Sequence, residues 1–166
     1  MTVVVADTSP LNYLILIEAI DLLPRLYGGI VIPVEVLNEL TDGGAPRPVS
    51  EWAMKLPECV EVRSVQSVND PALSPLDLGE RCAILLAQSE AEVLLLIDEA
   101  AGRREASRRG IPNTGTVGVL RAASIARLVD LPSALARLVA TNFRVSRSLL
   151  DELIAEDAAR EDEPTE

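Results

Sequence analysis

Two aspartates stand directly after the most apolar runs of this sequence. Asp7 follows residues 3–6 and Asp98 follows residues 93–97, so each comes where a strand of a parallel sheet would end. Ligands of open α/β sheets bind at that edge. If the two strands are neighbours, the carboxylates face each other across about 5 Å, the spacing of adjacent strands. Two anions at that distance repel unless a cation lies between them, and oxygen ligands of this kind favour Mg²⁺ or Mn²⁺.

Two glutamates are further candidates for the same edge. Glu39 lies on the helix expected after the second strand, and Glu80 lies in the first turns of a later helix. Each acid also has a purely structural interpretation. Asp7 can cap a helix or form a turn, Glu39 can be solvated, Asp77 and Glu80 can form a capping box, and Asp98 can begin a helix. No single acid decides between the two interpretations.

The elements that must position these acids alternate along the chain. Short runs rich in Val, Ile and Leu are separated by longer helical patterns, which is typical of a parallel sheet with helical crossovers. We find no internal repeat and no linker. We therefore expect residues 1–159 to form one α/β domain and residues 160–166 to form a disordered acidic tail. Strands are expected at residues 3–6, 30–32, 60–65 and 93–97, and helices near residues 51–56, 76–88, 99–109, 117–129, 132–140 and 146–159.

The composition of the 166-residue chain excludes several chemistries. Histidine is missing, so there is no Ser-His-Asp triad and no His-containing zinc site, and two cysteines cannot complete a four-ligand zinc cage. The net charge of −11 has the wrong sign for bulk attraction of nucleic acid. However, residues 151–166 hold eight of the 26 acids and only one of the 15 bases. Most of the negative charge therefore belongs to the C-terminal segment.

The sequence carries no sign of export or of membrane insertion. Its first residues lack the basic region and long apolar stretch of a signal peptide. The longest unbroken apolar run, residues 93–97, is far shorter than the roughly 20 residues that a membrane helix needs. We therefore expect a cytoplasmic protein with no membrane association.

In their order along the chain, the segments around the four acids resemble the PIN domain. The closest likeness is to its prokaryotic toxin-like branch, related to the VapC ribonucleases of toxin–antitoxin pairs. The resemblance runs from residue 3 to about residue 153. It rests on the segments 5–11, 32–40, 78–80, 96–106, 115–120 and 142–146.

The resemblance implies a three-layer α/β/α fold with a central parallel sheet and an acidic pocket for one or two Mg²⁺ or Mn²⁺ ions. In that family a metal-activated water attacks an RNA phosphodiester. The resemblance assigns Asp7 and Asp98 as principal metal ligands. It assigns Glu39 and Glu80 as further ligands or as groups that hold water on the metal. Supporting positions are matched by Ser9, Thr116 and Arg103.

Three other features each allow more than one interpretation. The basic helix at residues 103–109 fits either RNA-phosphate binding or a solvated face paired with nearby glutamates. Residues 114–118 fit a phosphate-binding turn less well than a tight strand-to-helix turn. The four aromatic residues are too few and scattered for a base-stacking platform, so we expect them to pack in the core or an interface. They are Tyr13, Tyr27, Trp52 and Phe143.

The expected function is that of a metal-dependent endoribonuclease, the toxin of a toxin–antitoxin pair. The expected partners are an RNA substrate, a small antitoxin protein and a second copy of the chain. The alternative is a catalytically silent PIN-like module that binds a protein or an RNA without cleaving it. The low basic charge favours this alternative, and the intact set of four acids speaks against it.

Overall fold

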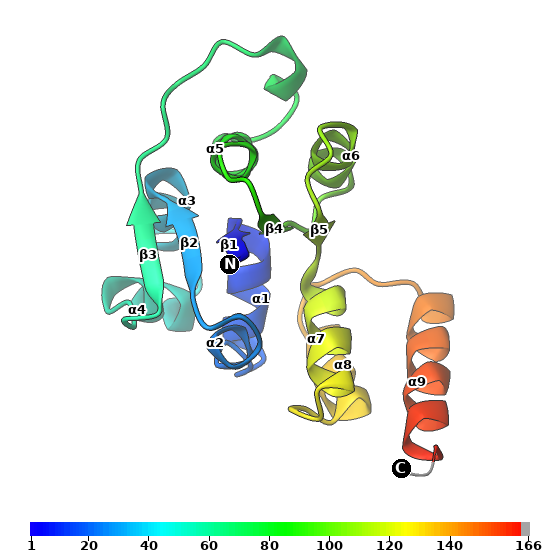
Figure 1. Cartoon of the computed structure of the whole chain (residues 1–166). Helices are drawn as coiled ribbons and strands as arrows, with labels where there is room; N and C mark the ends of the chain where they lie inside the picture. Colours follow the sequence, from blue (N-terminus) through cyan, green and yellow to red (C-terminus); the bar gives the residue numbers. More distant parts are fainter. Residues whose placement is uncertain (164–166) are drawn as a thin grey trace.

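A parallel sheet forms the centre of the molecule, and helices cover both of its faces (Figure 1). The computed structural model describes residues 1–163. Over this range the sheet has five strands in the order β3-β2-β1-β4-β5, and all neighbours run parallel. This confirms the expected three-layer α/β/α class. The strands are β1 (Val3–Ala6), β2 (Ile30–Pro33), β3 (Val60–Arg63), β4 (Val93–Leu96) and β5 (Asn113–Thr114).

Alternate residues of β1, β2 and β4 enter two separate cores. Val4 and Ala6 of β1 belong to the larger core, which packs against α1, α2, α7 and α8. Val5, between them, belongs to the smaller core under α5 and α6. Successive side chains of a strand point to opposite faces, so strands buried on both faces read as continuous apolar runs. The helices are α1 (Thr8–Leu16), α2 (Leu22–Tyr27), α3 (Val34–Leu40), α4 (Arg47–Met54), α5 (Leu78–Gln88), α6 (Ala100–Arg108), α7 (Thr116–Ile125), α8 (Leu131–Val139) and α9 (Arg147–Glu161).

The helix boundaries differ from the expected ones where local signals compete. Helix α4 begins at Arg47 rather than at residue 51, because a proline at the second helical position is compatible with a helix start. Helix α2 was not predicted from the sequence. Helix α9 continues through Glu161, two residues beyond the expected domain end, and its N-cap Ser146 accepts a hydrogen bond from the Leu149 backbone.

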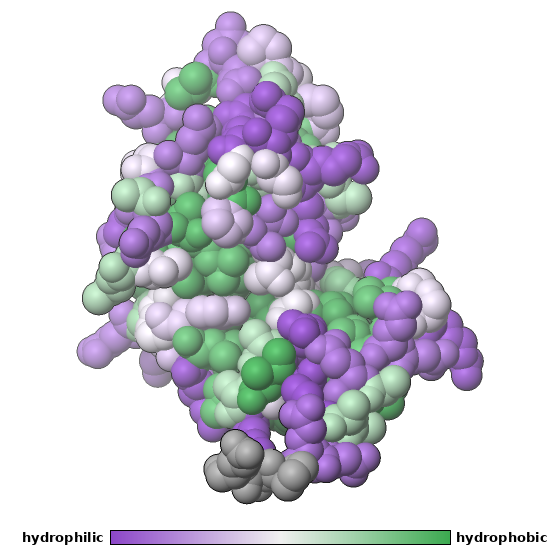
Figure 2. Space-filling view, turned by 45° about the vertical axis from the view of Figure 1, so that its right-hand side comes forward, coloured by the Kyte–Doolittle hydropathy of each residue, from purple (hydrophilic) through white to green (hydrophobic). Residues whose placement is uncertain are grey.

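The acidic C-terminal segment is described only in part. The disorder expected for residues 160–166 falls partly on residues 164–166, which lie outside the described residues. Helix α9 buries Leu153 but leaves Leu149 and Ile154 about 40% exposed. Apolar patches among polar residues are visible on the face shown in Figure 2. Within residues 1–163, the helices are either too short or too polar for a membrane span.

Candidate metal centre

The strand order changes direction between β1 and β4, and the candidate acids lie at that point. From β1 the chain builds β2 and β3 on one side of the sheet and then returns to build β4 and β5 on the other. Ala6 and Leu96 are paired in register, and the backbone N–H of Asp7 donates to the Leu96 carbonyl at 2.9 Å. Asp7 and Asp98 therefore leave neighbouring strands at the edge where α/β proteins bind ligands.

Three carboxylates gather at this edge. Asp7, Glu39 and Asp77 each offer an oxygen within 4.8 Å of the oxygens of the other two. Asp77 was expected only as a capping residue, so sequence reasoning missed its place in the cluster. The three acids open into a cavity of about 250 Å³. Its lining residues are Asp7, Thr8, Ser9, Asn12, Tyr13, Glu39, Asp77, Glu80 and Glu99.

Asp7 is the most confined of these acids. Its side chain is 3% exposed, and its Oδ1 has no hydrogen-bond partner among the described residues. Burial raises the pKa of Asp7 well above its usual range, and a hydrogen bond from the backbone of Thr8 offsets this only in part. The charges of Asp77, Glu80 and Glu39 raise the pKa of Asp7 further. An unpartnered carboxylate oxygen between other carboxylates fits the ligand set of a hard divalent cation.

Glu39 is held in place by groups from two other helices. The hydroxyl of Thr8 donates to its Oε2, and the backbone N–H of Gly79 donates to its Oε1 at 2.9 Å. A Cβ at position 79 would lie 2.5 and 2.6 Å from the two carboxylate oxygens of Glu39. Only glycine therefore allows the first turn of α5 to approach Glu39 this closely. The side chain is fixed over the sheet edge rather than solvated.

Glu80 has both of the roles weighed from the sequence. Its Oε2 accepts from the backbone N–H of Asp77 at 3.1 Å, while Asp77 Oδ1 accepts from the backbone N–H of Glu80 at 2.9 Å. This reciprocal pair is a capping box at the start of α5. Glu80 also lines the cavity, and burial followed by the charge of Asp77 raises its pKa. Capping and site membership are therefore compatible.

Asp98 lies beside the cluster, and three donors orient its carboxylate. The hydroxyls of Ser9 and Thr116 each donate to its Oδ2 at 2.8 Å, and the backbone N–H of Thr116 donates to its Oδ1 at 2.7 Å. A Cβ at Gly115 would lie 2.7 Å from Asp98 Oδ1. The structure thus brings Ser9 and Thr116 onto Asp98, while the three acids whose oxygens lie within 4.8 Å of one another are Asp7, Glu39 and Asp77.

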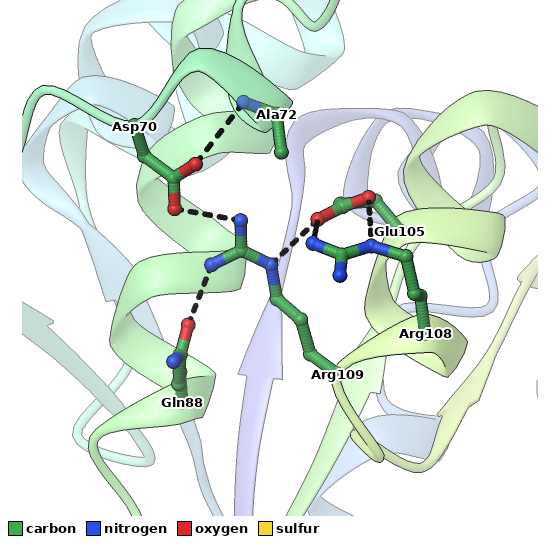
Figure 3. A network of polar contacts seen from close by, with 6 residues as sticks. All are labelled: Asp70, Ala72, Gln88, Glu105, Arg108 and Arg109. Atoms are coloured by element: carbon green, nitrogen blue, oxygen red, sulfur yellow. Dashed lines mark hydrogen bonds and ion pairs between the residues drawn. The ribbon is translucent and has the colours of Figure 1, made fainter.

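Two of the four arginines between residues 103 and 109 form ion pairs with residues that the structure describes. Arg108 and Arg109 both bind Glu105, and Arg109 also donates to Asp70 and Gln88 (Figure 3). Arg103 donates from its Nε to Asn113 Oδ1 at 3.3 Å. Glu99, in contrast, lines the acidic cavity. For Arg108 and Arg109 the structure therefore supports the ion-pair interpretation over direct phosphate binding.

Two aromatic residues that are distant in sequence meet at the cavity. The ring centroids of Tyr13 and Phe143 lie 4.9 Å apart in an edge-to-face arrangement, and Tyr13 also lines the cavity. The Tyr13 hydroxyl donates to Asn142 Oδ1 at 2.8 Å. The expected core packing is confirmed, because all four aromatic residues pack against the larger core. Tyr13 and Phe143 nevertheless lie together rather than scattered, because the fold brings the loop after α8 onto α1.

Fold and site together define an α/β protein with an acidic centre at the turning point of a parallel sheet. A family model described as a PIN domain, DUF3368, matches residues 3–158. The chain therefore belongs to the PIN-domain family, which confirms the family expected from its segments. PIN domains are nuclease-type folds and generally metal-dependent, in agreement with the acidic cluster. The comparison with curated proteins gives no match.

Proposed function

We propose that this protein is a metal-dependent endoribonuclease that hydrolyses RNA phosphodiesters at the acidic cavity. The observation that supports this most strongly is the gathering of Asp7, Glu39 and Asp77, in which Asp7 also has a buried Oδ1 without a partner among residues 1–163. Such an arrangement is electrostatically unfavourable without a cation. The carboxylate ligands favour Mg²⁺ or Mn²⁺ over softer metals.

The residues present fit a divalent cation, and they have distinct tasks around it. Asp7, Glu39 and Asp77 would hold the ion, with Asp98 and Glu80 beside them. A cation bound there lowers the pKa of water and offsets the charge that develops on the phosphoryl oxygens, and neither effect needs histidine.

The remaining contacts keep the carboxylates in position before substrate arrives. Thr8 and Gly79 orient Glu39, and Ser9 and Thr116 orient Asp98 through hydrogen bonds that do not depend on a ligand. Groups that orient metal ligands typically affect metal affinity or activity about 10- to 100-fold. Preorganisation of this kind is what a protein contributes to metal-assisted hydrolysis.

The direct test is RNA cleavage with Mg²⁺ or Mn²⁺ by the full chain and by matched Asp→Asn variants. Asp7→Asn and Asp98→Asn are expected to lower the rate by about 100-fold or more, because each removes a charge at the centre. Asp21→Asn is the control, since Asp21 is exposed and precedes α2 at the opposite end of the sheet. Wild-type rates in both site variants, or no cleavage by the wild type with either metal, would contradict the proposal.

The structure adds a comparison between the two acids of the capping box. If Asp77 holds the cation directly, Asp77→Asn lowers the cleavage rate more than Glu80→Gln does, although both variants weaken the cap of α5. If the two variants lose cleavage activity equally and also lose thermal stability equally, both residues act only as helix caps.

We further propose, on the resemblance to VapC ribonucleases, that the protein is the toxin of a toxin–antitoxin pair and forms a homodimer. Light scattering of the purified chain tests the dimer. Growth arrest on expression, relieved by a small protein encoded next to it, tests the toxin role.

A silent PIN-like module is the second candidate, and one observation favours it. Arg108 and Arg109 of the basic helix are already paired with acids, so they are not free to bind phosphate. Calorimetric titration with Mn²⁺ separates the two functions. A nuclease must bind the ion, while a module without catalytic activity need not.

A further inference from the structure

The loop that follows α8 contacts Tyr13, a residue that lines the acidic cavity. Tyr13, on α1, lines the cavity together with Asp7, Glu39 and Asp77. Phe143 packs edge-to-face against Tyr13, with ring centroids 4.9 Å apart, and Asn142 accepts a hydrogen bond from the Tyr13 hydroxyl. Burial raises the pKa of Tyr13, and the charges of Asp98 and Glu99 raise it further.

This loop is ordered by its own hydrogen bonds. The Thr141 hydroxyl donates to the Leu138 carbonyl at 2.6 Å and accepts from the backbone N–H of Phe143 at 3.1 Å. The Tyr13–Asn142 hydrogen bond then ties the loop to α1 across 129 positions of sequence. The aromatic pair is therefore arranged before any ligand binds, which lowers the entropy cost of binding.

The exposed chemistry of the group matches an unpaired nucleobase. Tyr13 and Phe143 pack against the larger core and are only partly buried there, so part of each ring remains exposed. In an edge-to-face pair, the ring that presents its edge keeps its own faces free of its partner. The amide oxygen of Asn142 is used by Tyr13, while its NH₂ group can donate to a base edge. Arg144 follows directly and is exposed, which adds positive charge beside the rings.

We propose that Tyr13, Asn142 and Phe143 form a nucleobase-binding subsite for single-stranded RNA next to the metal centre. This proposal rests on the proposed ribonuclease function and extends it to the substrate class. Bases stack on aromatic side chains only when they are not paired, so the subsite selects single strands over duplexes. A base held here would place an adjacent phosphate near the acids.

The test measures RNA binding separately from cleavage. Fluorescence anisotropy with a labelled single-stranded RNA, in EDTA and at low ionic strength, reports affinity without hydrolysis. Phe143→Ala is expected to weaken binding about 5-fold or more, the range found when a stacking aromatic is removed. Phe143→Leu keeps an apolar side chain without a π face and is expected to bind as weakly as Phe143→Ala. Phe143→Trp is expected to retain wild-type affinity.

Two controls distinguish stacking from loop structure. Tyr13→Phe removes the hydrogen bond to Asn142 but keeps the ring, so it is expected to weaken binding less than Phe143→Leu does. An RNA with a single abasic nucleotide, moved along the strand, is expected to bind the wild type more weakly at one position. For the RNA that is abasic at that position, we expect Phe143→Leu to bind no more weakly than the wild type.

The outcomes separate this proposal from the ribonuclease function itself. If Phe143→Leu binds single-stranded RNA as tightly as the wild type, or if duplex RNA binding falls equally, the subsite is wrong even where Mg²⁺-dependent cleavage is observed. If the substitutions change only self-association or binding of a protein partner, the surface is a protein interface and the proposal is overturned. If binding follows the expected order and no metal supports cleavage, the subsite stands and the nuclease proposal fails.

Discussion

At the scale of single residues, the carboxylate of Asp7 shows most clearly how the site depends on its surroundings. It is buried next to Glu39, Asp77 and Glu80, and both burial and these charges raise its pKa. The pKa of Glu80 is raised for the same reasons. Both acids therefore favour the protonated form in the folded chain more than in the unfolded chain.

The difference in the pKa of Asp7 between the folded and the unfolded chain predicts how the stability of the metal-free protein depends on pH. The folded state keeps a proton on Asp7 at pH values where the unfolded chain has lost it, so stability falls as the pH rises from about 4 through the raised pKa. Asp7→Asn removes this titration. We expect urea unfolding between pH 4 and 8 to show the variant gaining stability relative to the wild type as the pH increases. If the stability difference between Asp7→Asn and the wild type is the same at every pH in this range, Asp7 does not have the raised pKa that we expect.

At the scale of secondary-structure elements, Gly79 sets how closely α5 can approach α3. Gly79→Ala places a Cβ against both carboxylate oxygens of Glu39, and that flexible side chain must move. We expect cleavage to fall by about 10- to 100-fold, as for loss of a group that orients a metal ligand. Stability should not fall, because alanine is favoured in helices by up to about 1 kcal/mol. Gly43→Ala, with open space around its Cβ, is the control.

The network around Arg109 connects three segments that lie far apart in the sequence. Arg109, at the end of α6, binds Asp70 in the loop before α5, Gln88 at the end of α5, and Glu105 one turn earlier (Figure 3). Its side chain is 9% exposed. The network thereby anchors the loop that leads to Asp77.

We expect Arg109→Met to lower the urea midpoint clearly and Arg108→Met to leave it almost unchanged. Arg108 is 63% exposed and, among residues 1–163, pairs with Glu105 alone, and exposed ion pairs contribute little. Hydrogen bonds from Arg108 and Arg109 lower the pKa of Glu105 to about 2. The contribution of this network is therefore present at neutral pH and is lost as the pH falls from about 4.5 toward 2. If the urea midpoint of Arg109→Met stays equally far below that of the wild type at low pH, this expectation is wrong.

At the scale of the whole molecule, the cation is expected to act as part of the fold. A ligand that binds only the folded state stabilises it by about 2.7 kcal/mol at a hundredfold excess over its dissociation constant. We expect Mn²⁺ to raise the thermal midpoint of the wild type and of Asp21→Asn but not of Asp7→Asn. An equal rise in all three proteins would show that the ion binds elsewhere.

The sequence by itself determined the class of fold and the edge of the sheet where the acids lie. Apolar runs buried on both faces can hardly form anything other than parallel strands with helical crossovers, and an acid that directly follows such a run must lie at the end of its strand. Asp7 and Asp98 could be placed near each other on that basis, whereas Ser9 and Thr116 were expected there only from the resemblance to the PIN domain. The same logic extends to Glu39, whose helix starts directly after β2.

Only the tertiary structure decided which acids share an ion and what surrounds them. Asp77 looks like a helix cap in the sequence because capping is a local pattern, while its approach to Asp7 and Glu39 depends on how the loop before α5 packs. The Tyr13–Phe143 pair joins residues 130 positions apart, and no periodicity encodes such a contact. Strand and helix patterns depend on neighbouring residues in the sequence, whereas the geometry of a binding site depends on packing between residues that are far apart in the sequence.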